Sequence, residues 1–296
     1  MSAALSVARA PLPAPSPADG TPQGEFSFEA RDFDRVRDLI YRRAGISLHA
    51  GKQAMVYSRL SRRLRETGHR SFGAYLQWLE AAQGAAGDTE WQEFVNALTT
   101  NLTAFFREEH HFHVLADELR ARARNGLRIW CSAASTGEEP YTLAMTLAEA
   151  LADHPGALGS ARIVASDIDT RVLATATRGV YATDARGLTP QRQRQHFMRG
   201  TGANGGFMRV KPELARLVEF RPLNLMEPRW SLGESFDIVF CRNVMIYFDA
   251  ETQRRVIGQI HAVMKPGGLL FVGHSENFTE MKDLFRLRGK TIYERL

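Results

Sequence analysis

Three acidic residues follow stretches that are typical of buried strands. Glu138 and Glu139 come after an apolar run that begins at Leu127 and a turn of small residues, and they open a helical apolar pattern. Asp167 follows a second strand-like run, ARIVA. In doubly wound sheets, an acidic residue after the second strand holds the hydroxyls of a ribose. The alternative is that Asp167 only caps the helix that starts near Thr170.

The composition of the first turn restricts the ligand further. Gly137 is the only glycine in CSAASTGEEP, so the dinucleotide-binding pattern is missing. Two carboxylates at the start of the following helix would also repel a pyrophosphate. We therefore expect a ligand that lacks phosphate groups and carries a positive charge.

Length and composition are those of an ordinary globular protein. The chain has 296 residues, of which 44% are hydrophobic and 24% charged. No apolar run of about eighteen residues occurs, so no membrane span is expected. Cys131 and Cys241 each end a predicted core strand, and we expect both thiols to be reduced and buried in a cytoplasmic protein.

The net charge of +5 is concentrated near the N-terminus. Residues 31–70 carry eleven Arg or Lys and four Asp or Glu. Within them, a helix is predicted over about 52–67, and Arg59, Arg62 and Arg63 lie away from its apolar side. Such a face can bind nucleic acid, an acidic membrane surface or an acidic protein helix. It is also compatible with an ordinary solvated helix surface.

The pattern along the chain predicts several segments. Residues 1–24 are rich in Ala, Pro and Ser and are predicted to be disordered. Residues 25–98 carry four helical patterns, which predict a small all-α domain. Residues 99–126 are a linker and the first helix of the next domain. Residues 127–296 alternate strands and helices, which predicts an α/β doubly wound sheet. A Gly-Gly turn between alternating runs predicts an antiparallel β-subdomain inserted at about 180–222.

Some boundaries can be predicted more closely. The last helix of the all-α domain is expected at about 89–99. The alternating run Leu217–Arg221 is expected to pair within the β-subdomain, and Phe285–Arg295 to form one closing antiparallel strand. Phe236–Cys241 is continuously apolar, as in a strand covered on both faces. The histidines around His111 lack suitably spaced partners, so no metal site is expected.

Several long motifs together resemble the CheR family, the chemotaxis receptor glutamate methyltransferases that use S-adenosylmethionine. They occur in family order, and the resemblance covers about residues 27–296. It implies a Rossmann-like S-adenosylmethionine methyltransferase domain with an inserted small antiparallel β-subdomain, preceded by a small all-α domain. The motifs are NLTAFFRE at 101–108, WCSAASTGEEPYTLAM at 130–145, SDID at 166–169, FDIVFCRNVMIYFD at 236–249 and KPGGLLFVGHSE at 265–276.

The resemblance also implies a set of cofactor contacts. Glu138 suits the positively charged ammonium or sulfonium side of S-adenosylmethionine, and Asp167 suits its ribose. The implied cofactor-binding residues are Asn101, Thr103, Arg107, Glu138, Asp167, Asn224, Leu225, Arg242 and Asn243.

The implied reaction is displacement of the methyl group from a sulfonium by a glutamate carboxylate. A glutamate with a pKa of about 4.3 is ionised at neutral pH, so no general base is required. Arg107 could hold the substrate carboxylate or the carboxylate of the cofactor, and Tyr247 could orient substrate or sulfonium. Aromatic packing is the alternative for Tyr247. We predict these two residues to be catalytic.

The resemblance implies receptor partners and a cytoplasmic protein recruited to receptor arrays. Arg59, Arg62 and Arg63 are predicted to contact acidic methylation helices. The segment Met198–Phe207 resembles the family branch whose β-subdomain binds the receptor's C-terminal pentapeptide by strand addition. No nucleic-acid partner and no membrane insertion are expected. The alternatives are a methyltransferase for another protein or nucleic acid, and a module that binds S-adenosylmethionine for signalling.

Overall fold

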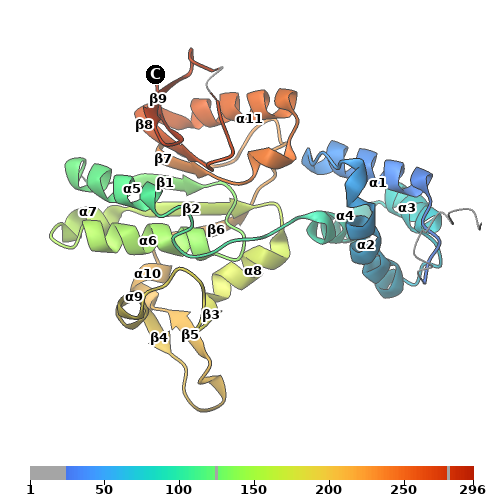
Figure 1. Ribbon diagram of the computed structural model, residues 1–296, viewed down its shortest axis with the longest axis horizontal. Coiled ribbons are helices and arrows are strands. Elements are labelled where there is room, and N and C mark those ends of the chain that lie inside the picture. The colour runs from blue at the N-terminus through green and yellow to red at the C-terminus, as the bar shows by residue number, and fades with distance from the viewer. Residues whose placement is uncertain (1–24, 124–125, 279–280) are drawn as a thin grey trace, which may run out of the picture.

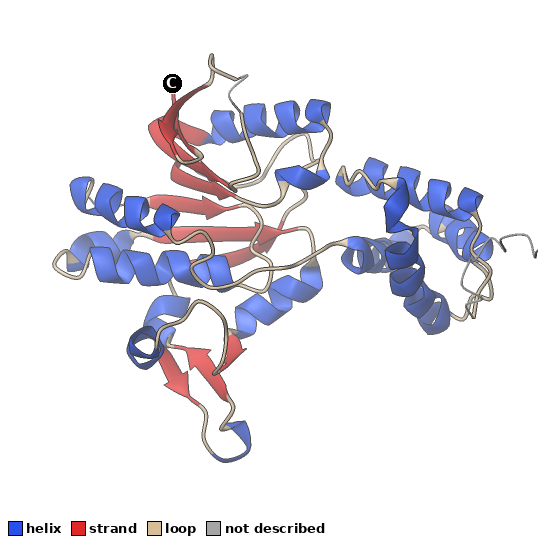
Figure 2. Cartoon of the chain, in the orientation of Figure 1, coloured by secondary structure: helices blue, strands red, loops and turns tan. Residues whose placement is uncertain are grey.

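A computed structural model describes residues 25–123, 126–278 and 281–296, and the tail over 1–24 lies outside the described residues. Figure 1 shows a helical domain beside a larger α/β domain, with a linker between them. Figure 2 shows helices on both sides of a central sheet and a second, small sheet. This arrangement confirms the predicted fold class.

The helical domain is built from four helices and a short 3-10 turn. Apolar residues at helical spacing, such as Val36, Ile40, Val56 and Leu60, are fully buried in one shared core. The last helix begins earlier than predicted, because its first turn contains little apolar periodicity. The elements are α1 (Ala30–Ala44), η1 (Ala50–Lys52), α2 (Gln53–Thr67), α3 (Phe72–Ala81) and α4 (Gly84–Leu98).

The central sheet has seven strands in the order β6-β2-β1-β7-β8-β10-β9. The first five are mutually parallel, whereas β10 is antiparallel to both of its neighbours. The strands are β1 (Arg128–Cys131), β2 (Arg162–Asp167), β6 (Val218–Pro222), β7 (Phe236–Cys241), β8 (Met264–Val272), β9 (Phe285–Gly289) and β10 (Ile292–Arg295).

Alternate strand residues enter two separate cores on the two faces of the sheet. Ile129, Ile163 and Ile238 pack in the core that includes α5 (His110–Ala121) and α6 (Glu138–Ala150). Trp130 and its neighbours on adjacent strands pack in the core under α11 (Ala250–Val263). Two further helices follow α6 along the chain, α7 (Pro155–Ser160) and α8 (Thr170–Arg178). Because the five strands are parallel, their carboxyl ends lie together at one end of the sheet, where the βα turns meet.

The small sheet has the order β3-β5-β4 and is antiparallel. The predicted pairing of Leu217–Arg221 within it is wrong. That run forms β6, which pairs with β2 in parallel at the edge of the central sheet. Edge strands are half exposed, so their alternation looks like that of a hairpin strand. The subdomain contains β3 (Val180–Ala182), α9 (Pro190–His196), β4 (Phe197–Arg199), η2 (Gly202–Asn204), β5 (Phe207–Val210) and α10 (Pro212–Ala215).

The C-terminal prediction of one strand is also wrong, because β9 and β10 form a hairpin. Lys290 and Thr291 at its turn have φ of 49° and 61°, the left-handed region that tight turns require. No helix among the described residues is long and apolar enough to cross a membrane.

Candidate active site

A cavity of about 320 Å³ lies where the parallel strands end. Its lining comes from the ends of β2, β6 and β7, from the turn after β1, and from the linker after α4. The helical domain closes another side through Ile46, Leu48, Lys52 and Met55. Nothing in the sequence pattern indicated these four residues, because the contact depends on how the two domains pack.

Most of the predicted cofactor and catalytic residues line this one cavity, although they lie far apart in sequence. Asn224 and Leu225 take part because they follow β6, which is the neighbour of β2. The predicted residues that line the cavity are Asn101, Thr103, Arg107, Asp167, Asn224, Leu225, Arg242, Asn243 and Tyr247.

The two glutamates at the start of α6 have different surroundings. Glu139 lines the cavity, whereas Glu138 does not. The carboxylate of Glu138 accepts a hydrogen bond from the hydroxyl of Thr136 at 2.6 Å, and burial raises its pKa. The role of Glu138 as a cofactor ligand stays a prediction, and Glu139 is a cavity residue that the sequence reasoning missed.

Asp167 lies at the end of β2 and is 8% exposed. Its Oδ1 accepts from the amide of Asp169 at 2.9 Å, and its Oδ2 accepts from the amide of Ser135 at 2.8 Å. Burial raises its pKa to about 6, although these backbone donors oppose the shift. Each oxygen keeps a second lone pair, so the carboxylate can still accept hydrogen bonds from a ligand.

Arg242 follows β7 and holds several cavity segments together. Its guanidinium is buried and lies 2.6 Å from Glu139 and 3.2 Å from Glu108, and it donates to the carbonyl of Arg107 at 2.6 Å. Burial alone would raise the pKa of Glu108, but Arg242 and hydrogen-bonding neighbours hold that pKa at about 2. Because these acceptors occupy most of its donors, Arg242 fixes the shape of the cavity wall.

Asn243 is fixed by the buried carboxylate of Glu276, which lies in the turn after β8. Its φ of 57° is left-handed, a conformation that asparagine tolerates better than most residues. The backbone amide of Asn243 donates to Glu276 at 2.9 Å. The backbone amides of Met245 and Gly273 donate to the same carboxylate at 2.8 and 2.6 Å. Glu276 therefore joins the turn after β7 to the turn after β8.

Arg107 and Tyr247 both line the cavity, and Arg107 keeps donors that are free among the described residues. Within the described part of the chain, the Arg107 guanidinium makes one hydrogen bond, to the carbonyl of Leu102 at 2.8 Å, and no ion pair. Its remaining donors are available to a carboxylate. Tyr247 lies in η3 (Met245–Tyr247), and its backbone carbonyl accepts from the amide of Ser47 of the helical domain at 2.8 Å.

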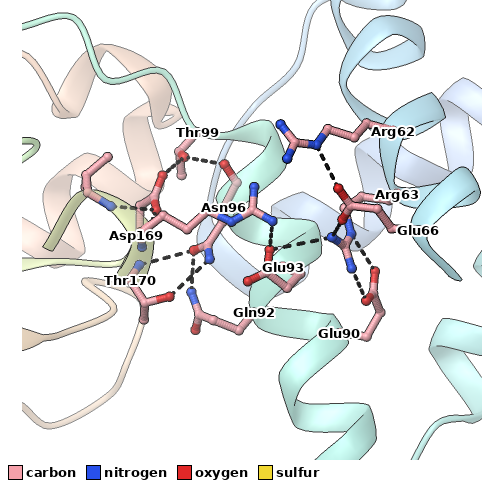
Figure 3. A network of polar contacts seen from close by, with 12 residues as sticks. Arg62, Arg63, Glu66, Glu90, Gln92, Glu93, Asn96, Thr99, Asp169 and Thr170 are labelled. Atoms are coloured by element: carbon pink, nitrogen blue, oxygen red, sulfur yellow. Dashed lines mark hydrogen bonds and ion pairs between the residues drawn. The ribbon is translucent and has the colours of Figure 1, made fainter. Parts of the chain in front are cut away.

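The three arginines predicted to form a basic receptor-binding face do not act alike. Arg63 is buried and donates to Glu90 at 3.0 Å, so its inclusion in an exposed face is wrong (Figure 3). Arg59 donates to the carbonyls of Leu98 and Thr99 at the end of α4. Arg62 is exposed and pairs with a neighbouring glutamate one helical turn away. Helical periodicity cannot reveal such internal partners, because they belong to another helix.

The fold and the cavity define the class of the protein. A doubly wound sheet that presents an acid after its second strand, without phosphate-binding glycines, is the arrangement of an S-adenosylmethionine-dependent methyltransferase. The chain belongs to the CheR methyltransferase family. Residues 31–99 match the family's all-alpha domain, and residues 101–293 match its SAM binding domain.

Relatives from several bacteria are similar over nearly the whole chain. A "Chemotaxis protein methyltransferase" of Klebsiella aerogenes is 53% identical, over 88% of this chain and 88% of that protein. The protein of the same description in Escherichia coli is 52% identical, over 88% and 89%. "Chemotaxis protein methyltransferase 2" of Pseudomonas aeruginosa is 50% identical, over 96% and 99%.

The residues present fit S-adenosylmethionine. Asp167 offers free lone pairs for ribose hydroxyls, and Arg107 offers free donors for the carboxylate of the methionine part. Ile168, Leu223 and Leu225 supply apolar lining beside Asp167, which suits the faces of a purine ring. Glu139 also lines the cavity, with its carboxylate paired to Arg242.

Proposed function

We propose that this protein transfers a methyl group from S-adenosylmethionine to glutamate carboxylates of chemotaxis receptors and forms methyl esters. The observation that carries the proposal is the pairing, in one cavity, of a ribose-accepting Asp167 with an Arg107 that has no carboxylate partner among the described residues. Membership of the CheR methyltransferase family and the similarity to chemotaxis protein methyltransferases support it.

The side chains would act mainly by holding reactants in place. When bound, S-adenosylmethionine supplies an electrophilic methyl group on a sulfonium. Arg107 orients a carboxylate through its free donors, and Tyr247 lies at the same cavity. The acceptor glutamate is already ionised at neutral pH. The enzyme therefore needs alignment and exclusion of water rather than a general base.

The cavity mouth suits an acidic protein segment. Leu102 is 77% exposed and Ile246 is 51% exposed, and both line the cavity. Lys52 also lines it and has no ion pair within the described residues. Apolar contacts beside a cation match a helix that presents a glutamate among apolar residues. We assign this mouth, together with the exposed Arg62, to the receptor's methylation helix.

The small sheet would bind a second part of the receptor. β4 lies at the edge of the order β3-β5-β4, and Met198 on it and Phe207 on β5 are 43% and 49% exposed. An open edge can accept the receptor's C-terminal pentapeptide as an added strand. These partners would place the protein in the cytoplasm at receptor arrays, without nucleic-acid binding and without insertion into the membrane.

The test is transfer of labelled methyl from S-adenosylmethionine to receptor-containing membranes, with wild type and Arg107→Ala. We expect base-labile label in the receptor with wild type and a loss of at least about a hundredfold in the variant, because an aligning charged contact is lost. Cofactor binding without any receptor labelling by the wild type would overturn the proposal in favour of a different protein substrate or a sensing role.

A further inference from the structure

Four residues at the cavity form a closed ring of hydrogen bonds. The amide of Asp169 donates to Asp167 at 2.9 Å, and the amide of Ser135 donates to the other oxygen of Asp167 at 2.8 Å. The Ser135 hydroxyl donates to the carbonyl of Asn101 at 3.3 Å. The Asn101 side-chain amide closes the ring on Asp169 at 2.8 Å. The ring joins the linker, the turn after β1 and the end of β2.

Asn101, Ser135 and Asp167 line the cavity, whereas Asp169 does not. It is 2% exposed. Its Oδ1 accepts the amides of Arg171 and Val172 at the start of α8, at 2.9 and 3.3 Å. Its Oδ2 accepts the Thr99 hydroxyl at 2.6 Å (Figure 3). The same oxygen also accepts the Asn101 side-chain amide. Both oxygens must accept, which only an ionised carboxylate does without rearranging its donors.

We propose that Asp169 is a positioning residue for the cofactor site. One oxygen fixes the start of α8, and the other fixes the linker that enters from the helical domain. Through the linker it holds Asn101, and through its own backbone amide it holds the rotamer of Asp167. This inference rests on the proposed cofactor site. Without the carboxylate, Asn101 and Asp167 would each have to be ordered when the cofactor binds, which lowers affinity.

Three residues of α4 also attach the helical domain to the chain just after β2. The Asn96 side chain donates to the Thr170 hydroxyl at 3.0 Å and accepts from the Thr170 amide at 3.2 Å. Glu93 forms an ion pair with Arg171, and Gln92 donates to the carbonyl of Ile168 at 2.8 Å. The helical domain therefore contacts four successive residues after Asp167, of which Asp169 alone belongs to the ring.

The experiment compares Asp169→Asn with Asp249→Asn. Asp249 is a matched control, because it caps α11 through the Thr252 amide at 2.8 Å and accepts the hydroxyl of Tyr41 of the helical domain at 2.6 Å. Both substitutions convert one carboxylate oxygen to a donor at a helix cap between the domains. Only Asp169 is in the ring. Calorimetric titration with S-adenosylmethionine gives Kd, thermal unfolding gives Tm, and receptor methylation gives KM and kcat.

We expect Asp169→Asn to raise the Kd and KM for S-adenosylmethionine by about tenfold or more, as loss of buried acceptors predicts. The Kd of Asp249→Asn should stay within about twofold of wild type. An unchanged Kd for a folded Asp169→Asn would overturn the inference and leave Asp169 as a helix cap only. If wild type itself does not bind the cofactor, the proposed function fails as well.

Thr99→Val decides the question if Asp169→Asn does not fold. This variant removes one hydroxyl from the carboxylate and keeps the cap of α8. A smaller rise in Kd, of about threefold, with a nearly unchanged kcat supports the positioning role. Wild-type affinity in a folded Thr99→Val overturns it.

Discussion

At the residue scale, the raised pKa of Asp167 predicts a cofactor affinity that depends on pH. Burial puts this pKa at about 6 in the free protein. Two ribose hydroxyls can donate only to the ionised form, so the pKa is lower in the complex and binding releases a proton at low pH. The affinity for S-adenosylmethionine should therefore fall by nearly tenfold per pH unit below about pH 6 and level off above about pH 7. Calorimetric titrations between pH 5 and pH 8 measure this slope.

Two neighbouring groups titrate below that pH window. The pKa of Glu108 is about 2, because Arg242 and its hydrogen bonds outweigh burial, and burial chiefly lowers the pKa of His111 to about 4. Asp167→Asn should bind more weakly and show no slope between pH 5 and pH 7. A wild-type affinity that is constant over this range would contradict the assignment of Asp167 to the ribose.

Single residues also show where sequence reasoning ends. Asp167 was predictable, because an acid after a strand marks the sheet's carboxyl edge. Which of Glu138 and Glu139 faces the cavity was not predictable. Adjacent helix residues point about 100° apart, and packing decides how the helix is rotated about its axis. Glu276 was not predictable either. It contacts Asn243 only because β7 and β8 are paired.

At the scale of elements, the basic side of α2 divides into an internal and an external part. Arg63→Met should lower the free energy of unfolding by about 3–5 kcal/mol, because Glu90 would be left buried without its charged partner. The Tyr75 hydroxyl, which donates to Glu90 at 2.7 Å, cannot replace that charge. Denaturant unfolding measures the loss, and a change below about 1 kcal/mol would contradict it.

Arg62 should behave in the opposite way. Its pair with Glu66 is exposed, so Arg62→Glu should hardly change stability. If α2 faces an acidic receptor helix, the KM for receptor should rise several-fold while the Kd for S-adenosylmethionine stays the same. Arg120→Glu on α5 is the control, because Arg120 is also exposed and paired within its helix. Equal receptor KM values for the two variants would remove α2 from the receptor interface.

The exposed apolar residues at the cavity mouth give a third prediction. Leu102→Ser and Ile246→Ser should each raise the receptor KM by about tenfold, since burial of such a side chain contributes about 1.5–3 kcal/mol when complete. Their Kd for S-adenosylmethionine should change little. Leu287→Ser on β9 is the control, being 49% exposed but outside the cavity lining. If both mouth variants keep the wild-type KM for receptor, the receptor does not bind at the cavity mouth.

Elements were predictable where periodicity is strong and ambiguous where strands lie at an edge. β7 agrees with its predicted bounds, because a continuous apolar run has few alternatives. The sequence pattern predicts the wrong sheet for β6, since its half-exposed alternation carries no information about its partner. The short strands β3 and β4 also lacked a signal. Three residues of strand are too few for a period to be recognised.

At the scale of the whole molecule, the two domains build one site. The helical domain supplies cavity lining and contacts the α/β domain near Asp169 and near Tyr247. It also contacts that domain where Asn224 donates to the carbonyl of Arg43 at 2.7 Å. No segment of sequence shows this closure, because each partner belongs to a different domain. Receptor recognition through α2 would therefore take place on a body that also completes the cofactor cavity.

The edge of the small sheet is the proposed second contact with the receptor. Removing one backbone donor on that edge tests this contact. The Gly200 amide donates to the carbonyl of Phe207 on β5, so by strand alternation the Arg199 amide faces the open edge of β4. Arg199→Pro removes that donor, and proline is tolerated on edge strands. If a receptor's C-terminal segment adds to this edge, tethering raises its local concentration and hence its methylation at low receptor concentration.

Wild type should methylate full-length receptor faster than receptor without its last five residues, by about tenfold or more at concentrations below KM. Arg199→Pro should bring that ratio close to one while its rate on the truncated receptor equals that of wild type. The truncated receptor is the internal control, because a misfolded variant would lose activity on both. A ratio that stays at the wild-type value would show that the edge of β4 does not hold the receptor, since a missing donor must weaken an added strand.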